Sequence, residues 1–452
     1  MNKKIKKIKV SLSHSIDFQV NGGKKLSGTI KTNFSKNGSV GLLCASLVNS
    51  GVTTLHGIAR IEEVYRVIEI LESIGVVVKW LNQNSLSIIP PLPPKKFTLE
   101  NINVESSIKT RSVVMLMGPL IHKLSSFSIP HPHGCNLGKR TIAAHIYALE
   151  ELGVKMKTTA KNYEITAKKL KPAEIVMYES SDTACENVLT ASSLISGTTT
   201  ISFASANYMV QEVCFFLEAL GVKIDGIGTA TLTVHGIKEI NKDIEYWNSE
   251  DPIESMMFIS AGIITDSRLI ISRCPIDFLS LELEKLKRMN LKYKISKTYY
   301  SFNARTKLAD IEIFPSKLKA LNDKLHSNPY PGINIDNLPF FVPIAMQARG
   351  QTMIHDWVYE NRAIYLTELN RLGADITLAD PHRLYINGGT PLKSAQVVCP
   401  PALRPSMVIL ISMLGASGTS ILRNVYMINR GYEEIAERLN SIGADIKIIK
   451  GN

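Results

Sequence analysis

Leu439-Asn440-Ser441-Ile442-Gly443, followed by Ala444-Asp445-Ile446-Lys447-Ile448, predicts how this chain folds. Two apolar residues three positions apart lie on the same side of a last helical turn, and glycine can take the left-handed conformation that ends a helix. The next residues alternate between apolar and polar, which is typical of a half-buried strand. The stretch therefore predicts a helix, a glycine stop and a strand in direct succession.

The same pattern, Leu-x-x-[Leu/Ile/Met]-[Gly/Asn], occurs six times along the chain, and the last residues of successive copies lie 78, 68, 69, 83 and 70 positions apart. A glycine and a threonine-rich strand start precede most copies. The copies end at Gly75, Gly153, Gly221, Asn290, Gly373 and Gly443, and the strand starts are at Gly51, Gly197, Gly350 and Gly418. Six matches at a near-constant period specify a repeated strand-helix-strand unit.

Six such units divide naturally into two domains of three units each. The loop Tyr246-Trp247-Asn248-Ser249-Glu250-Asp251-Pro252 is rich in turn residues and is the best candidate for the crossing between the third and fourth units. We therefore expect an α/β (α+β) fold with two similar domains. The cleft between two such domains is a common place for a substrate site.

The composition is that of a globular protein with excess positive charge: 452 residues, 45% apolar, 20% charged, and a formal net charge of +12. No run of 18 uncharged apolar residues appears, so we expect no transmembrane helix. The basic start, Met1–Lys9, is not followed by the apolar region of a signal peptide, which favours a cytoplasmic protein. The charge suits an anionic partner: nucleic acid, a membrane surface or a small phosphorylated substrate. Because the chain has no helix-turn-helix or zinc-finger spacing, we favour the small anion.

One cysteine of six lies in a distinctive loop, His131-Pro132-His133-Gly134-Cys135-Asn136-Leu137-Gly138-Lys139-Arg140. The scattered cysteines do not form a disulfide pattern, so we expect them to be reduced. Turn-forming residues leave the Cys135 thiol near the surface, and nearby cations favour its thiolate. Cys135 is a candidate acid or nucleophile, and the alternative is a small apolar residue on a turn. A metal held by His131, His133 and Cys135 lacks a fourth ligand, so we expect no metal.

Several short motifs occur together with this loop. They are Ser35-Lys36-Asn37, Thr110-Arg111, Gly118-Pro119-Leu120, Gly134-Cys135-x-x-Gly138-x-Arg140, His145, Asp336, Glu360-Asn361-Arg362, Leu403-Arg404 and Arg430-Gly431-Tyr432-Glu433. With these motifs the chain resembles the enolpyruvyl transferases over nearly its whole length. The resemblance is closest to the branch that acts on UDP-N-acetylglucosamine in peptidoglycan synthesis.

The resemblance implies an inside-out α/β barrel in each domain, with three repeated units around central helices and the active site in the interdomain cleft. In that fold the first residues join the second domain, so the first crossing is expected near Lys31 to Ser35. The implied domains are residues 36–248, which carry the Cys135 loop, and residues 1–35 together with 249–452.

The implied reaction moves the enolpyruvyl group of phosphoenolpyruvate to an acceptor hydroxyl and releases phosphate, without a cofactor. Phosphoenolpyruvate carries a phosphate and a carboxylate, so several fixed cations are needed. The cationic residues that match the family are Lys36, Arg111, Arg140, Arg362, Arg404 and Arg430. Cys135 matches the general acid, which the epoxide fosfomycin is expected to alkylate, and Asp336 matches the group that takes the proton of the acceptor hydroxyl. Lys36 would hold the departing phosphate, and Asn37 would orient the acceptor or the intermediate. The residues expected to contact the acceptor are Asn37, His145, Ser181 and Asp336.

The chain departs from the family mostly where the nucleotide sugar is expected to bind. Thr141-Ile142-Ala143-Ala144-His145 replaces Pro-Val-Asp-Leu-His, Asn207-Tyr208-Met209-Val210 replaces Glu-Pro-Glu-Ile, and Glu179 replaces a lysine. Ala402 and Asn429 each replace an aspartate. Two hypotheses follow: a divergent enzyme on UDP-N-acetylglucosamine, or a relative that acts on a different nucleotide or sugar in specialised metabolism.

Two hypotheses from other classes also stand. A non-catalytic relative could bind a phosphorylated ligand and regulate another process, although simple binding does not require a proton donor such as Cys135. A nucleic-acid binder is motivated by the net charge alone. We favour small-molecule partners, phosphoenolpyruvate and a nucleotide-sugar acceptor, over nucleic acid or membrane.

Overall fold

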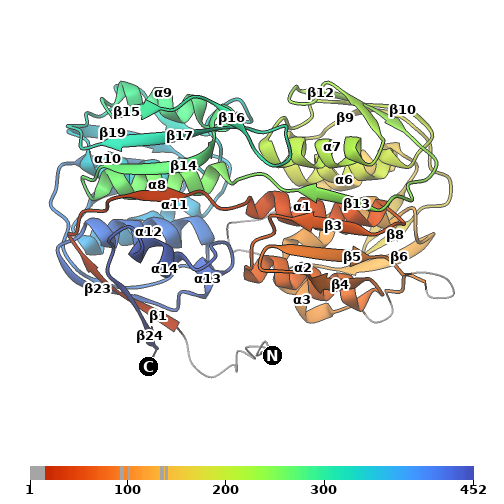
Figure 1. Cartoon of the computed structure of the whole chain (residues 1–452), viewed down its shortest axis with the longest axis horizontal. Helices are drawn as coiled ribbons and strands as arrows, with labels where there is room; N and C mark the ends of the chain where they lie inside the picture. The colour runs from red at the N-terminus through yellow and green to blue at the C-terminus, as the bar shows by residue number, and fades with distance from the viewer. Residues whose placement is uncertain (1–15, 92–95, 100–101, 133–136, 138–140, 452) are drawn as a thin grey trace.

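The computed structural model describes residues 16–91, 96–99, 102–132, 137 and 141–451. Its strands form six sheets, and Figure 1 shows them in two lobes joined near the middle of the view. In the lobe that contains α1, the sheets have the orders β13 (Ile244–Trp247), β3 (Thr53–His56), β5 (Ser85–Ile89), β4 (Val77–Trp80); β6 (Ser126–Pro130), β8 (Asn162–Thr166), β7 (Lys155–Thr158); and β11 (Lys223–Asp225), β12 (Thr231–Gly236), β10 (Gly197–Ser202), β9 (Glu174–Val176).

The other lobe contains the remaining three sheets, and one of them includes the first described strand of the chain. Their orders are β15 (Lys292–Ile295), β17 (Lys307–Phe314), β14 (Leu269–Pro275), β2 (Thr29–Lys31), with β16 (Tyr299–Tyr300) also on β17; β18 (Leu325–His326), β19 (Gly350–His355), β21 (Arg383–Gly388), β20 (Asp375–Asp380); and β22 (Gln396–Val398), β23 (Gly418–Arg423), β1 (Ile16–Gly22), β24 (Ile446–Lys450).

The helices of each unit fall into two sets. Those that lie inside the lobes are α1 (Lys36–Ala45), α4 (Met117–Leu120), α6 (Asp182–Ser193), α8 (Pro252–Ile264), α10 (Phe341–Gln347) and α12 (Leu403–Gly415). Those that carry the repeated motif are α2 (Glu62–Ser73), α5 (Ala143–Glu151), α7 (Tyr208–Ala219), α9 (Ser280–Arg288) and α14 (Ile435–Asn440), and the fifth copy lies in the 3₁₀ turn that directly follows α11 (Arg362–Leu366). Shorter helices are α3 (Val104–Lys109), α13 (Tyr426–Asn429), and the 3₁₀ turns η1 (Ser46–Val48), η2 (Arg111–Leu116), η3 (Ile276–Leu279), η4 (Leu338–Phe340) and η5 (Thr367–Leu372).

The repeated motif forms the structure that its sequence predicts. In all six copies the last residue has a positive φ, from 73° at Asn290 to 104° at Gly221. A strand follows each copy, namely β4, β7, β11, β15, β20 and β24, and the predicted threonine-rich strands are β3, β10, β19 and β23. The left-handed residue turns the chain out of the helix and into the sheet that covers it.

The inner helices are buried because they are apolar on every side. In α8 only Ile263 escapes full burial among its residues, and α12 is buried from Arg404 to Leu414. A helix that is hydrophobic all round belongs in a core rather than at a surface. The helices α8, α10 and α12 contact one another, and α6 contacts both α1 and α4, so each lobe has a helical centre covered by sheets.

Strand pairing divides the described strands into two groups. Strands between residues 53 and 247 pair only with one another, and strands within 16–31 and 269–450 do the same. The two crossings lie side by side, because Ser35 N donates to Ser249 O at 2.7 Å and Asn248 Nδ2 donates to Ser35 O at 2.9 Å. On this ground we propose domain boundaries at 36–248 and at 1–35 with 249–452.

Within the described residues, none of the helices has the length and the apolar character that crossing a bilayer requires.

Candidate active site

A cavity of about 810 Å³ lies between the two lobes. Its size is within the range of about 300 to 1,000 Å³ that is typical of small-ligand sites. Both lobes contribute to its wall: Lys36, Asn37, Arg111 and Ser181 come from one, and Asp336, Arg362, Arg404 and Arg430 from the other. Eight residues predicted from widely separated motifs therefore line one cavity.

The buried helices α1, α6 and α12 begin at this cavity. Lys36 and Asn37 open α1, Asp182 and Thr183 open α6, and Arg404 is the second residue of α12. Helix N-termini present free N–H groups and the positive end of the helix dipole, so they favour anions. Because these helices lie inside the lobes, the N-termini of all three point toward the same cavity.

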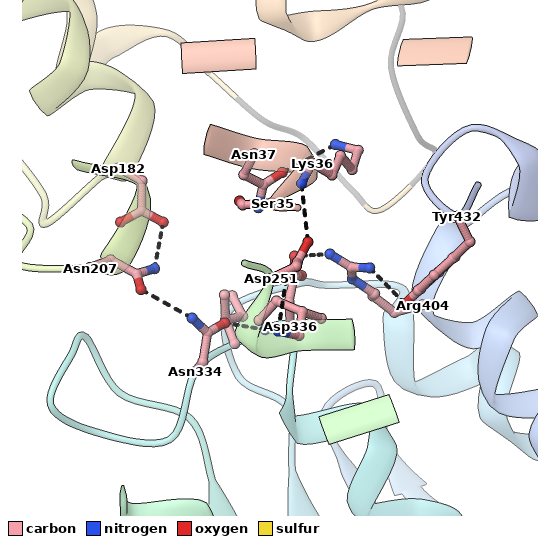
Figure 2. Close-up of polar contacts among 12 residues, drawn as sticks. Ser35, Lys36, Asn37, Asp182, Asn207, Asp251, Asn334, Asp336, Arg404 and Tyr432 are labelled. Atoms are coloured by element: carbon pink, nitrogen blue, oxygen red, sulfur yellow. Dashed lines mark hydrogen bonds and ion pairs between the residues drawn. The ribbon is translucent and has the colours of Figure 1, made fainter. Parts of the chain in front are cut away.

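Asp336 lies at the centre of the polar contacts in Figure 2. Its Oδ2 accepts from Arg404 Nη2 at 2.9 Å, and Arg404 Nη1 donates to Tyr432 Oη at 2.8 Å. Burial favours the neutral carboxyl, but attraction to Arg404 and Arg362, with the hydrogen bond from Arg404, outweighs it and lowers the pKa of Asp336. The side chain is 23% exposed, so Asp336 is an ionised carboxylate that a ligand can reach.

Arg362 is held by a bidentate ion pair with Asp356. Its Nε lies 2.5 Å and its Nη2 2.8 Å from the Asp356 oxygens, and both side chains are 1% exposed. The Nη1 atom points away from this pair, 3.7 Å from Asp336 Oδ1, and has no hydrogen-bond partner among the described residues. A buried guanidinium nitrogen without a partner is a ready donor for a carboxylate or phosphate oxygen.

Lys36 and Asn37 are positioned by the start of α1. The Ser35 side chain caps the helix by accepting from Gly38 N at 2.9 Å. Lys36 Nζ then donates to Asn37 Oδ1 at 3.1 Å, and Asn37 Nδ2 donates to Tyr208 Oη at 3.0 Å. These bonds fix the Asn37 amide at the cavity wall, beside the Lys36 ammonium.

Two polar contacts join the lobes across the cavity. Arg430 Nη2 pairs with Glu63 Oε2 at 2.6 Å, and Asn334 Nδ2 donates to Asn207 Oδ1 at 3.2 Å. Burial would raise the pKa of Glu63, but Lys36 and Arg430 lower it overall, so the pair is ionic. At both of these contacts the walls of the cavity touch directly.

Asn207 also connects this contact to α6. Its Nδ2 donates to Asp182 Oδ2 at 3.1 Å, and Ser205 Oγ donates to Asp182 Oδ1 at 2.5 Å. Figure 2 shows the resulting chain from Asp182 through Asn207 to Asn334 and Asp336. Burial raises the pKa of Asp182, these two donors lower it, and the field of Asp336 raises it. The net result is a raised pKa at the end of the cavity that α6 forms.

Of the residues predicted to contact the acceptor, Ser181 lines the cavity and His145 does not. His145 is 2% exposed and lies behind the wall, with Nδ1 2.8 Å from Asn187 Nδ2 and Nε2 3.2 Å from Thr183 Oγ1. Burial and the nearby charge of Arg111 lower the pKa of His145 to about 3. His145 therefore does not reach the cavity itself. It contacts Thr183, which does line the cavity.

Two predicted residues, Cys135 and Arg140, lie outside the described residues. The five other cysteines are free and buried, and none lines the cavity. Burial raises the pKa of each, to about 11 for Cys399 and about 12 for Cys185. Such thiols are poor nucleophiles at neutral pH.

Polar residues of the site that were missed in the sequence include Glu63, Asp182, Thr183, Glu186 and Asn334. Asp182 directly follows the matched Ser181, so its place could have been inferred. Glu186 stands in the largely apolar run from Ala184 to Leu189, and an acid in a buried helix is a usable indication of function. Glu63 and Asn334 gave no local indication, because each acts through a partner on the other lobe.

Among the residues described, no group of three or more histidine, cysteine, aspartate or glutamate side chains is placed to hold a metal ion.

Known proteins of similar sequence match this chain over almost all of its length. A UDP-N-acetylglucosamine 1-carboxyvinyltransferase from Bradyrhizobium diazoefficiens is 32% identical over 440 residues, covering 96% of this chain and 98% of that protein. One of the same name from Treponema denticola is 32% identical over 433 residues, covering 96% and 99%.

The fold comparison agrees with the sequence comparison. The crystal structure of the enolpyruvyl transferase NikO from Streptomyces tendae superposes with a TM-score of 0.83 at 21% identity, covering 97% of this chain and 100% of that one. This confirms the predicted fold of two similar domains built from repeated α/β units. Residues 20–439 match the family described as EPSP synthase (3-phosphoshikimate 1-carboxyvinyltransferase). With this match and the near full-length relatives, the chain belongs to the EPSP synthase family of enolpyruvyl transferases.

Proposed function

We propose that this protein transfers the enolpyruvyl group of phosphoenolpyruvate to a hydroxyl of UDP-N-acetylglucosamine or a related acceptor, and releases phosphate. The observation that best supports it is the ionised Asp336, which is accessible from a cavity lined by five cationic side chains. These are Lys36, Arg111, Arg362, Arg404 and Arg430. The names of the relatives support the same reaction and acceptor.

The cations suit the charges of phosphoenolpyruvate. Its phosphate and carboxylate need several donors held at fixed positions, and guanidinium groups bind both in a bidentate manner. Arg362 is held rigidly by Asp356, and its Nη1 is left for a ligand. Lys36, at the positive end of α1, is placed to stabilise the phosphate as negative charge moves onto it during departure.

The reaction proceeds by addition and elimination. Asp336 takes the proton of the acceptor hydroxyl while the acceptor oxygen forms a bond to C2 of phosphoenolpyruvate, and Cys135 delivers a proton to C3. In the second step C3 loses a proton, the C2 double bond forms again, and the C2–O bond to phosphate breaks. The motif Gly134-Cys135-x-x-Gly138-x-Arg140 is the basis for assigning this proton transfer to Cys135.

The direct test is phosphate release from phosphoenolpyruvate in the presence of UDP-N-acetylglucosamine, with mass detection of the enolpyruvyl product. Phosphate and product should appear in equal amounts, and neither should appear without the acceptor. Absence of phosphate with every nucleotide or sugar acceptor tried would contradict the assignment and favour a non-catalytic, ligand-binding regulator. Retention on DNA at low salt that is lost steeply as salt rises would instead favour a nucleic-acid binder.

A second candidate is the same reaction on a different acceptor, and Glu179 favours it. This exposed carboxylate lines the cavity where the family pattern has a lysine, so it would repel a nucleotide phosphate at that position. UDP-N-acetylglucosamine remains the first acceptor to test, because the relatives from Bradyrhizobium diazoefficiens and Treponema denticola are both named after it. With that acceptor, the enzyme would act in the cytoplasm at the start of peptidoglycan synthesis.

Replacing Glu179 by lysine should therefore lower the KM for UDP-N-acetylglucosamine about three- to tenfold, because an exposed repulsion becomes an attraction. The matched control is Glu174→Lys, since Glu174 is exposed on β9 nearby but does not line the cavity. Initial rates at varied acceptor concentration measure the effect. An equal fall in KM for both variants, or none for Glu179→Lys, would show that Glu179 does not face a phosphate.

Cys135 should be alkylated by fosfomycin, and Cys135→Ser should lose most activity while keeping its thermal unfolding temperature. A thiol in a loop rich in cations is more reactive than the buried cysteines. Peptide mass spectrometry after exposure to fosfomycin locates the adduct, and buried Cys185 serves as the internal control. An unmodified Cys135, or a serine variant with wild-type activity, would contradict its role as proton donor.

A further inference from the structure

The wall that α6 contributes to the cavity differs from the cationic walls opposite. It presents Asp182, Thr183 and Glu186, and α6 contains no lysine or arginine. Thr183 and Glu186 are three residues apart, so they lie on the same face of the helix. This part of the cavity is lined by neutral or acidic oxygen groups.

Glu186 is buried and has an unused oxygen. It is 3% exposed, and its Oε1 has no hydrogen-bond partner among the described residues. Gly41 of α1 leaves the room for it, because a Cβ at Gly41 would lie 3.0 Å from Oε1. An unpartnered buried carboxyl is costly to the folded state, which suggests that a ligand supplies the partner.

The surroundings of Glu186 keep it uncharged. Burial raises its pKa well above the usual value, and the nearby carboxyl of Asp182 raises it further. The other titratable groups around it are the thiols of Cys44 on α1, Cys185 on α6 and Cys214 on α7, whose own pKa values are raised by burial. A neutral carboxyl offers an O–H donor to the cavity.

The hydroxyl hydrogen of Thr183 is also available for a hydrogen bond, because of how His145 contacts this residue. Asn187 Oδ1 accepts from Gly118 N at 2.9 Å, so Asn187 Nδ2 must donate to His145 Nδ1. The neutral imidazole then carries its proton on Nε2 and donates to Thr183 Oγ1. With its oxygen occupied in this way, the Thr183 hydroxyl can direct its own hydrogen into the cavity.

We propose that Thr183 and Glu186 form a subsite that donates hydrogen bonds to an uncharged oxygen of the acceptor, such as a sugar hydroxyl or an amide or base carbonyl. This rests on the proposed function and specifies which part of the acceptor meets α6. A phosphate is less favoured there than at the starts of α1 and α12, because Asp182 and Glu179 place carboxyl groups beside the N-terminus of α6 and α6 supplies no cationic side chain. His145 is a positioning residue that acts through Thr183.

The test compares Glu186→Leu, Glu186→Gln and Thr183→Val with the wild type. Calorimetry with UDP-N-acetylglucosamine should show affinity about 10- to 100-fold weaker for Glu186→Leu and Thr183→Val, and within about threefold for Glu186→Gln, whose amide keeps a donor. The KM for phosphoenolpyruvate should change less than twofold. Thermal unfolding should show that Glu186→Leu is folded, since leucine is readily buried.

Each remaining outcome decides between the proposals. If the wild type binds the nucleotide sugar but releases no phosphate, the proposed function fails and the affinity comparison still decides the subsite. If the wild type and both apolar variants bind UDP-N-acetylglucosamine with equal affinity, the proposed subsite is overturned. It is also overturned if the KM for phosphoenolpyruvate rises as much as the affinity for UDP-N-acetylglucosamine falls. A wild type that does not bind UDP-N-acetylglucosamine overturns the subsite as assigned to this acceptor.

Discussion

Replacing Asp336 by asparagine should lower kcat about 10²- to 10⁴-fold, the usual contribution of a general base. The amide has nearly the same shape but cannot take the proton of the acceptor hydroxyl. Arg404 keeps its contact with Tyr432 and the nearby charge of Asp251, so the variant should remain folded. Pre-steady-state measurement of phosphate release separates this chemical step from substrate binding.

The matched control is Asp356→Asn, which changes a buried aspartate that pairs with Arg362 but does not line the cavity. That variant should affect the KM for phosphoenolpyruvate and stability more than the chemical step. A kcat for Asp336→Asn within tenfold of the wild type would contradict the role of Asp336 as base.

Replacing Arg404 by glutamine should lower the free energy of unfolding by about 3 to 5 kcal/mol, the usual cost of leaving a buried charge without its partner. Arg404 is 6% exposed and interacts with the carboxyl groups of both Asp336 and Asp251, so its removal leaves both without this compensating charge. Denaturant unfolding monitored by circular dichroism measures the change. The double variant Asp336→Asn with Arg404→Gln should recover part of the loss, because one of the two carboxylates is then neutral.

The single variant Arg404→Gln should also shift the pH dependence of the reaction. The pKa of Asp336 is lower in the folded than in the unfolded protein, so the ionised carboxylate stabilises the folded state at pH values above the unfolded pKa. This stabilisation is lost as the pH falls through the pKa that Asp336 has in the folded protein. Without Arg404 the pKa of Asp336 should rise, so activity should begin to fall at a higher pH. An acid limb of kcat/KM at the same pH as in the wild type would show that Arg404 does not set this pKa.

The architecture could be predicted from the sequence because its information is local. A left-handed residue after two apolar positions ends each motif-bearing helix within five residues, from Leu71 to Gly75 in the first copy. Six copies repeat the same short-range constraint. The burial of α8 and α12 follows equally from their continuous apolar runs.

The arrangement of the site could be predicted only in part. The motifs identified Lys36, Asp336 and Arg404, which the structure places in one cavity. Contacts such as that between Glu63 and Arg430 join residues 367 positions apart, and no local pattern encodes them. His145 matched a family position, yet the sequence alone did not indicate that Asn187 and Thr183 would enclose it.

The position of β1 has a consequence for how the protein is made. This strand is synthesised before the other described strands, yet it pairs with β23 and β24, and its Val20 is opposite Ile446. The sheets within residues 53–247 can form while the rest of the chain is being synthesised, because all their strands are present early. The sheet that contains β1 must wait until β23 and β24 have been synthesised, and closing such a long loop makes this pairing a late step of folding. A chain truncated before Gly418 should therefore expose β1 as an unpaired edge and aggregate, even though it keeps every residue that lines the cavity except Arg430.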